Sequence, residues 1–241
     1  VRGQKAKDWR LVDDLAKPAV FEQSVRERAL ALAAESDRPQ DGKGVSLTPL
    51  KRAIEADALR YRHVTVEMDR KARTATFRMD APAGEQPADI AAIEAAGAGW
   101  YPLELARELE DAILSMRTNE PELGTWLITT RGDSDALLAM DRTLLDNREH
   151  WLVRETIGLL RRTLSRFDVS SRSLFALIDE GSCFAGSFLE LALACDRSYH
   201  LALPDDEAAA PAIVVNEVNF GLYPMVTDES RLQRRFYNEQ P

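Results

Sequence analysis

Apolar and polar residues alternate in two short stretches before the middle of the chain. The apolar members are Val64, Val66 and Met68 in the first stretch and Ala75, Phe77 and Met79 in the second. A period of two places these side chains on one face of a strand, and the polar break at residues 69–73 suits a turn. The pattern predicts a β-hairpin with one buried face.

Helical spacing of apolar residues marks four other parts of the chain. Residues 1–36 are predicted to form two helices around a short extended piece. A further helix is expected over residues 48–59, because this stretch opens on Thr followed by Pro, which suits an N-cap and a first helical position. Two longer amphipathic helices are predicted at 100–118 and 148–167.

Short apolar runs at 125–130, 174–178 and 199–203 have the length of buried strands. After the hairpin they alternate with the predicted helices, which is the order of βαβ units. The sequence therefore predicts an α/β fold. A polar stretch rich in Gly and Pro follows the first helices, so we expect a helical N-terminal piece with a linker at 1–60 and a main domain at 61–241.

The most informative stretch for chemistry is 174–196. A strand is followed by a polar turn containing glycine, and helical spacing then runs from Gly186 to Cys195. The start of a helix offers unpaired N–H groups and positive dipole to a developing oxyanion. Glu190 lies one turn into this helix, where its carboxylate can reach a substrate held at the helix start.

This stretch resembles the second oxyanion-hole segment of the crotonase (enoyl-CoA hydratase/isomerase) superfamily. Glu180 and Gly181 match the turn of that segment, and residues 190–196, reading ELALACD, match its helix. The family usually has three glycines before the helix, whereas this chain has Gly-Ser-Phe at 186–188. A Cβ in this loop obstructs close approach of a thioester to the backbone.

Two more passages resemble the same family. Residues 139–141, AMD, fall where the family has Gly-Ala-Asp, so that Met140 takes the place of the first oxyanion donor. Residues 136–145 also fit an ordinary packed helix. The passage 215–222, VNEVNFGL, resembles the family's Pro-Glu-Ile-Asn-Phe-Gly-Leu, and Glu217 takes the place of its second catalytic glutamate.

The resemblance implies a crotonase-like spiral of βαβ units and a CoA thioester as the substrate, with no separate cofactor. It implies that Met140, Gly186 and Ser187 bind the thioester oxygen. It also implies that Glu190 and Glu217 are catalytic and move protons or place water. The alternative for both glutamates is a solvated or salt-bridged side chain.

Several passages together resemble one group within the superfamily, ring-opening lyases that act on aromatic-derived CoA thioesters. These passages are residues 2–14, 46–64, 153–178, 181–194 and 216–226. The group has two crotonase-like domains in tandem, is dimeric, and opens 2,3-epoxybenzoyl-CoA with water to give formate and an acyl-CoA semialdehyde. The resemblance implies that the chain holds the tail of a preceding crotonase-like domain and a second domain that is incomplete at its C-terminus.

Two alternatives to a ring-opening lyase stay open, which makes three candidate functions in all. The altered glycine loop suits a non-catalytic crotonase-like domain that serves dimerisation or support. A third possibility is a general enoyl-CoA hydratase or isomerase, which turnover of crotonyl-CoA would identify.

Composition excludes several classes of function. The 241 residues carry a net charge of −9, which disfavours binding to nucleic acid or to an anionic membrane. No stretch approaches the roughly 20 apolar residues of a membrane span. The two cysteines, Cys183 and Cys195, suggest free thiols in the cytoplasm. Cys183 has no neighbouring His to activate it, and no spacing of His, Cys and Asp suggests a metal site.

Overall fold

A seven-stranded sheet is the frame of the larger part of the chain, in a computed structural model that describes residues 1–37, 42–206 and 210–239. The strand order is β1-β2-β3-β4-β5-β6-β8. The strands are β1 Ala53–Ile54, β2 Ala58–Arg60, β3 Val64–Asp69, β4 Thr74–Asp80, β5 Thr125–Arg131, β6 Ser173–Ile178 and β8 Arg197–His200. Strands β1 to β4 pair antiparallel, and β4, β5, β6 and β8 pair parallel. The predicted hairpin and the predicted βαβ order are both confirmed.

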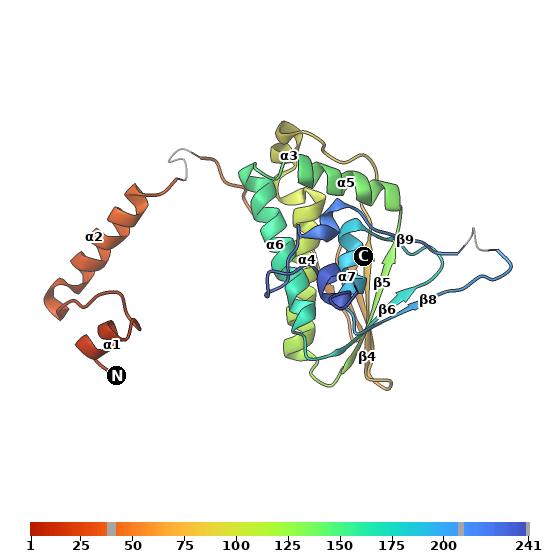
Figure 1. Cartoon of the computed structure of the whole chain (residues 1–241), viewed down its shortest axis with the longest axis horizontal. Coiled ribbons are helices and arrows are strands. Elements are labelled where there is room, and N and C mark those ends of the chain that lie inside the picture. The colour runs from red at the N-terminus through yellow and green to blue at the C-terminus, as the bar shows by residue number, and fades with distance from the viewer. Residues whose placement is uncertain (38–41, 207–209, 240–241) are drawn as a thin grey trace. The chain divides into compact units, whose positions relative to one another are not determined.

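The helices of this part lie on one face of the sheet, where Figure 1 shows α4, α6 and α7 side by side. The helices are α3 Ile90–Ala96, α4 Tyr101–Asn119, α5 Ser134–Asp146, α6 Trp151–Asp168, α7 Gly186–Leu193 and α8 Arg231–Arg235. The described residues of this part also form the 3-10 turns η2 Gly97–Gly99 and η4 Glu217–Phe220, and a second parallel pair, β7 Phe184–Ala185 with β9 Ile213–Val214. The fold class expected from the sequence, α/β around a central sheet, is confirmed.

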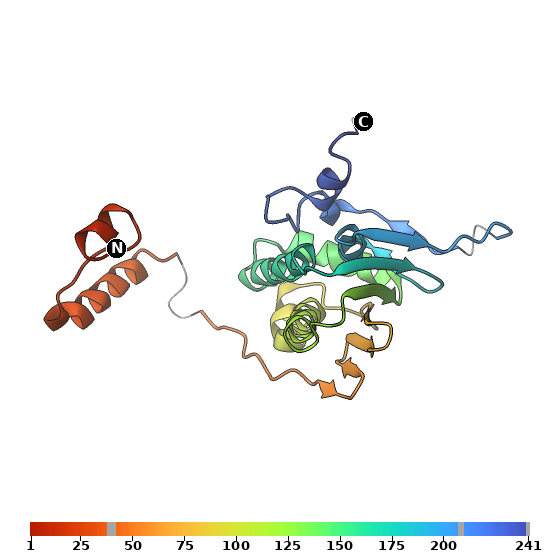
Figure 2. The same ribbon diagram turned by 90° about the horizontal axis from the view of Figure 1, so that it is seen from below.

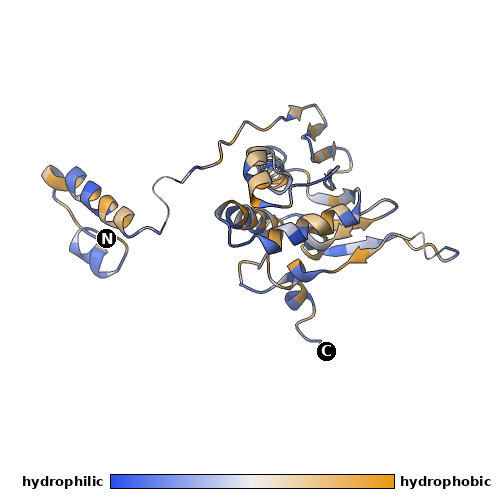
Figure 3. Cartoon of the chain, turned by 90° about the horizontal axis from the view of Figure 1, so that it is seen from above, coloured by the Kyte–Doolittle hydropathy of each residue, from blue (hydrophilic) through white to orange (hydrophobic). Residues whose placement is uncertain are grey.

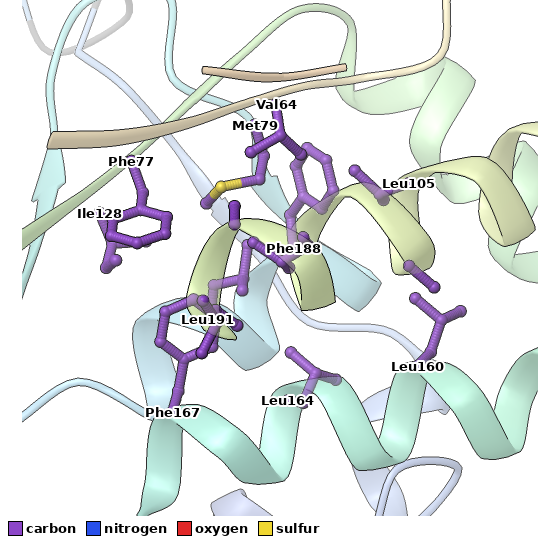
Figure 4. Packing of buried hydrophobic residues seen from close by; sticks show 14 of the residues in the cluster. Val64, Phe77, Met79, Leu105, Ile128, Leu160, Leu164, Phe167, Phe188 and Leu191 are labelled. Atoms are coloured by element: carbon purple, nitrogen blue, oxygen red, sulfur yellow. The ribbon is translucent and has the colours of Figure 1, made fainter. Parts of the chain in front are cut away.

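The core lies between the sheet and these helices. Strands β3 and β4 bury their apolar side chains on one face, as the period-two pattern predicted. Figure 4 shows the side chains of β3, β4 and β5 facing those of α4, α6 and α7. The residues labelled there are Val64, Phe77, Met79, Ile128, Leu105, Leu160, Leu164, Phe167, Phe188 and Leu191. Helix α7 is buried over most of its length, so the segment predicted to carry the chemistry lies within the core.

The expected helix at 48–59 is wrong, because strands β1 and β2 occupy its second half. Leu59 pairs with Val66 of β3, and both side chains are buried. Figure 2 shows this short hairpin, in orange, at the edge of the sheet. The cap signal at Thr48 and Pro49 is local, and it is overridden by the burial of apolar side chains against the sheet edge.

The N-terminal part forms a separate unit, Val1–Gly44, and the rest forms the unit Val45–Pro241. The sequence placed this boundary near residue 60. The smaller unit holds α1 Gln4–Asp8, η1 Pro18–Val20 and α2 Phe21–Ala34. Two helices were predicted here, and Figure 3 shows apolar and polar residues interleaved along α2. No residue of these elements is buried, so the apolar face of α2 is open in this unit.

Candidate functional site

The site is built where β6 ends, the chain turns, and α7 begins. The turn contains Gly181 in a left-handed conformation, with φ of 76°. Strand β7 follows and pairs in parallel with β9, so that Phe184 lies opposite Ile213. The pairing brings residues 216–220 next to the start of α7, and η4 contacts this helix. Two passages that the sequence analysis singled out separately therefore meet in space.

Gly186, the first residue of α7, has no room for a side chain. Its φ is 45°, and a Cβ there would lie 1.8 Å from Oδ2 of Asp141 and 2.8 Å from Nδ2 of Asn216. Asp141 comes from α5 and Asn216 from the segment before η4. The glycine is thus required by the close approach of a carboxylate to the helix start.

The carboxylate of Asp141 occupies the N-terminus of α7. The backbone N–H of Ser187 donates to its Oδ2 at 2.9 Å, and the Ser187 hydroxyl donates to its Oδ1. Nδ2 of Asn216 donates to Oδ2 at 3.0 Å. Burial raises the pKa of Asp141 to about 6, although the bonds from Ser187 and Asn216 act in the opposite direction. The Ser187 N–H, a predicted thioester ligand, is already paired in this structure.

Met140 lies in the interior of α5, so the alternative that predicted a packed helix for 136–145 is confirmed. An interior helical N–H bonds to the carbonyl four residues earlier, so the Met140 N–H is not free for a thioester oxygen. The Met140 side chain lines a small apolar cavity of about 20 Å³ together with Ser187, Phe188 and Tyr223. The Tyr223 hydroxyl lies 3.0 Å from the Ser187 hydroxyl.

Glu190 is held in a buried ion network. Its Oε2 lies 2.9 Å from Nη1 of Arg231, and its Oε1 accepts from Nδ2 of Asn219 at 2.7 Å. Arg231 also pairs with Asp168 through two bonds, of 2.7 and 3.1 Å. Burial raises the pKa of Glu190 above its ordinary value, and its bonds to Asn219 and Arg231 oppose that shift. Both carboxylate oxygens are therefore engaged by groups of the protein itself.

Glu217 has a different environment. It is the first residue of η4 and is exposed, whereas Asn219 of the same turn is buried and reaches Glu190. Asn216 and Asn219 cap η4 reciprocally. The fold thus brings Gly186, Ser187 and Glu190 to the turn that holds Glu217, but the two glutamates lie in different surroundings, one buried and one exposed.

Sequence patterns did not identify the residues that fill this region. Asp141 was noted only within the passage AMD at 139–141, and Arg231 had no predicted role. Asn219 was part of a quoted passage but had no predicted role. A buried arginine must find carboxylate partners, but the sequence alone does not say which carboxylates those are.

Other candidate chemistry finds no support in the described residues. Cys183 is buried, and burial raises the pKa of its thiol to about 11, which keeps it protonated at neutral pH. No group of three or more His, Cys, Asp or Glu in the described ranges could hold a metal ion. None of the helices in the described part of the chain is long and apolar enough to cross a bilayer.

Comparison with known proteins gives one strong similarity. All 241 residues align with benzoyl-CoA-dihydrodiol lyase of Aromatoleum evansii at 52% identity, and they span 43% of that protein's length. The resemblance predicted from the sequence, to a segment of a longer lyase, is confirmed. No family model matches the chain.

Solved structures of enoyl-CoA hydratases are also similar to this chain. The hydratase of Geobacillus kaustophilus HTA426 aligns with 58% of this chain and 46% of its own, at 18% identity and a TM-score of 0.37. The hydratase of Bacillus anthracis aligns with 72% of this chain and 58% of its own, at 16% identity and a TM-score of 0.38.

Proposed function

We propose that this chain is part of a lyase of aerobic benzoyl-CoA degradation. The enzyme would open the ring of 2,3-epoxybenzoyl-CoA with water and release formate and an acyl-CoA semialdehyde. The identity of 52% along every residue of the chain to a protein named benzoyl-CoA-dihydrodiol lyase supports this assignment. The substrate would be a CoA thioester, and no separate cofactor is expected.

Within that enzyme, we assign this chain a supporting role. The observation that carries the assignment is the bond from the Ser187 N–H to Asp141. An oxyanion hole needs donors that are aimed at the place where negative charge develops. Here the donor of α7 is paired with a carboxylate that is itself negatively charged when ionised, and a thioester oxygen would have to displace it.

The two glutamates fit the same role. A general acid or base needs to reach the proton that it moves. Glu190 is bonded through both oxygens to Arg231 and Asn219, so it stabilises the packing of α7 against the C-terminal segment. Glu217 is exposed at the start of η4. In this proposal the chemistry belongs to a preceding crotonase-like domain of the enzyme.

The same chain would contribute to a homodimer of the enzyme. Phe220, Phe236 and Tyr237 are among the residues that line a surface hollow beside α8, and Phe220 and Tyr237 are 72% and 71% exposed. Exposed apolar patches of this kind mark protein interfaces. We also place the enzyme in the cytoplasm, since Cys183 and Cys195 are free and buried, as thiols are in a reducing compartment.

The test is formate release by the full-length enzyme that carries this sequence. Supplied with 2,3-epoxybenzoyl-CoA, the enzyme should release one formate for each acyl-CoA semialdehyde formed. Crotonyl-CoA serves as the comparison substrate, and no hydration of it is expected. Hydration of crotonyl-CoA without formate from the epoxide would overturn the proposal in favour of an enoyl-CoA hydratase.

A further inference from the structure

An arm of the chain leads from β8 to β9, and both Figure 1 and Figure 2 show it extending away from the helices and the sheet. The described residues of this arm are 201–206 and 210–212. All four residues of β8 are exposed, and β8 pairs only with β6 among the described strands. The sheet therefore has an open edge beside the arm, and native proteins either protect such an edge or pair it with a partner.

Exposed apolar side chains are concentrated between this arm and α8. Those in the described residues from 199 to 237 are Tyr199, Leu201, Ile213, Val215, Phe220, Val226, Phe236 and Tyr237. The rest of the unit Val45–Pro241 exposes only Leu47, Ile54, Leu114 and Val169 among its described large apolar residues. Val215, just after β9, already lines the hollow beside α8, together with Phe220, Glu229 and Glu239. The base of the arm and the hollow thus form one surface of the kind that protein partners cover.

The two ends of this surface carry opposite charge. The arm contributes Asp205 and Asp206, and α8 contributes Arg234 and Arg235, and all four residues are exposed. Neither arginine forms an ion pair with a carboxylate of the described residues, although Arg234 lies over the ring of Tyr237. The positive charge of α8 is therefore available to an acidic partner.

A second copy of the chain is the partner that this arrangement fits. In a two-fold symmetric pair the same surface faces itself, so the arm of each copy meets α8 of the other. Both acidic–basic contacts then form together, whereas a partner without this symmetry would match only one end. Nη2 of Arg235 donates to the carbonyl of Cys195 at 3.2 Å, two residues before β8. The base of the arm and α8 thus lie on the same side of this unit, as a shared interface requires.

We propose that the arm of one copy packs on the hollow and on α8 of a second copy, so that Asp205 and Asp206 face Arg234 and Arg235 of the other copy. Burial of apolar side chains such as Phe220 supplies the affinity, since the hollow has glutamates of its own. The charges of the arm and of α8 set the orientation of the pair. The pairing rests on the homodimer proposed above and specifies its contact.

Charge reversal with mixing tests this contact in the full-length enzyme that carries this sequence. The arm variant combines Asp205→Arg with Asp206→Arg, the helix variant combines Arg234→Glu with Arg235→Glu, and sedimentation equilibrium measures the dimer dissociation constant. Each variant alone should have a dissociation constant at least about tenfold above that of wild type, because like charges meet at both symmetric contacts. An equimolar mixture should form heterodimers about as tight as the wild-type dimer, because each arm then meets an α8 of opposite charge.

Two further variants serve as controls. Asp146→Arg combined with Glu149→Arg makes the same change in net charge as the arm variant, at exposed positions between α5 and α6, and should leave the dissociation constant unchanged. Phe220→Ala should weaken the dimer without any change of charge. Because Phe220 is 72% exposed, its urea midpoint of unfolding should stay that of wild type at concentrations where both proteins are monomers.

Three results would overturn the pairing. The first is a monomeric wild-type enzyme, and the second is a dimer whose dissociation constant neither charge variant alters. The third is a pair of weakened variants that fail to associate when mixed, because the contact would then lie within one polypeptide. Formate release is measured separately: a monomer that releases formate keeps the proposed lyase function and loses this interface, and a dimer of the expected charge dependence without formate does the reverse.

Discussion

Glu190 and Arg231 form an ion pair inside the protein, with 2.9 Å between Oε2 and Nη1 and side chains that are 2% and 1% exposed. Arg231 pairs on its other side with Asp168 of α6, whose side chain is 7% exposed. The arginine thus joins α6 and α7 to the start of α8. Glu190, which the family resemblance predicted to move protons, is part of this buried ion network between the three helices.

Removal of the arginine should be costly. Arg231→Met leaves two buried carboxylates without their cation, and the expected loss is about 3–5 kcal/mol of unfolding free energy. Urea unfolding of the full chain measures it. Arg154→Met on α6 is the matched control, because its ion pair with Glu155 is exposed and should contribute little. Similar losses of unfolding free energy in the two variants would contradict a stabilising role for the buried network.

The glycine at the start of α7 gives a second prediction. Gly186→Ala places a Cβ against Oδ2 of Asp141 and adds strain at a positive φ, so it should cost at least about 2 kcal/mol. Gly158→Ala is the control, because Gly158 lies within α6 and a Cβ there meets nothing within 4 Å. That change should stabilise the protein by about 0.5–1 kcal/mol. Tolerance of alanine at 186 would contradict the observed approach of Asp141.

Stability should depend on pH through Asp141. Burial raises its pKa from an ordinary value of 3.8 to about 6, so between these values the folded state binds more protons than the unfolded state. The stabilising effect of Asp141 is therefore present at low pH and is lost as pH rises through 6. The total is on the order of 3 kcal/mol.

This pH effect is measured as the difference in unfolding free energy between wild type and Asp141→Asn. The difference isolates Asp141 because the contributions of other carboxylates, such as Asp179 with its pKa lowered by Arg131, are present in both proteins and cancel. Wild type should lose stability relative to Asp141→Asn between pH 4 and pH 7. A constant difference, or a gain with pH, would contradict a raised pKa.

Local patterns were enough to predict most of the elements. The alternation at Val64 to Met68 predicts a strand with one buried face, and the apolar run before Gly181 has the length of a buried strand. The failure at 48–59 has a clear cause. An N-cap at Thr48 would stabilise a helix by less free energy than the strand gains by burying Leu59 against the sheet.

The site was predictable only in part. The sequence placed Gly186, Ser187 and Glu190 on one helix start, as observed. The partners of these residues were not predictable from the sequence. Asp141 lies 46 residues from Ser187, and Arg231 lies 41 residues from Glu190. These long-range contacts decide whether a buried glutamate binds a substrate or pairs with an arginine. They cannot be predicted from the local patterns of a single sequence.

The most direct test of the supporting role is the turnover number for formate release from 2,3-epoxybenzoyl-CoA by the full-length enzyme and its Glu190→Gln and Glu217→Gln variants. Activity is expressed per folded enzyme, because Glu190→Gln weakens the buried ion pair. We predict an unchanged kcat in both variants. A loss of about 10²-fold or more in either variant, the size expected for a removed general acid or base, would contradict the account and assign the chemistry to this domain.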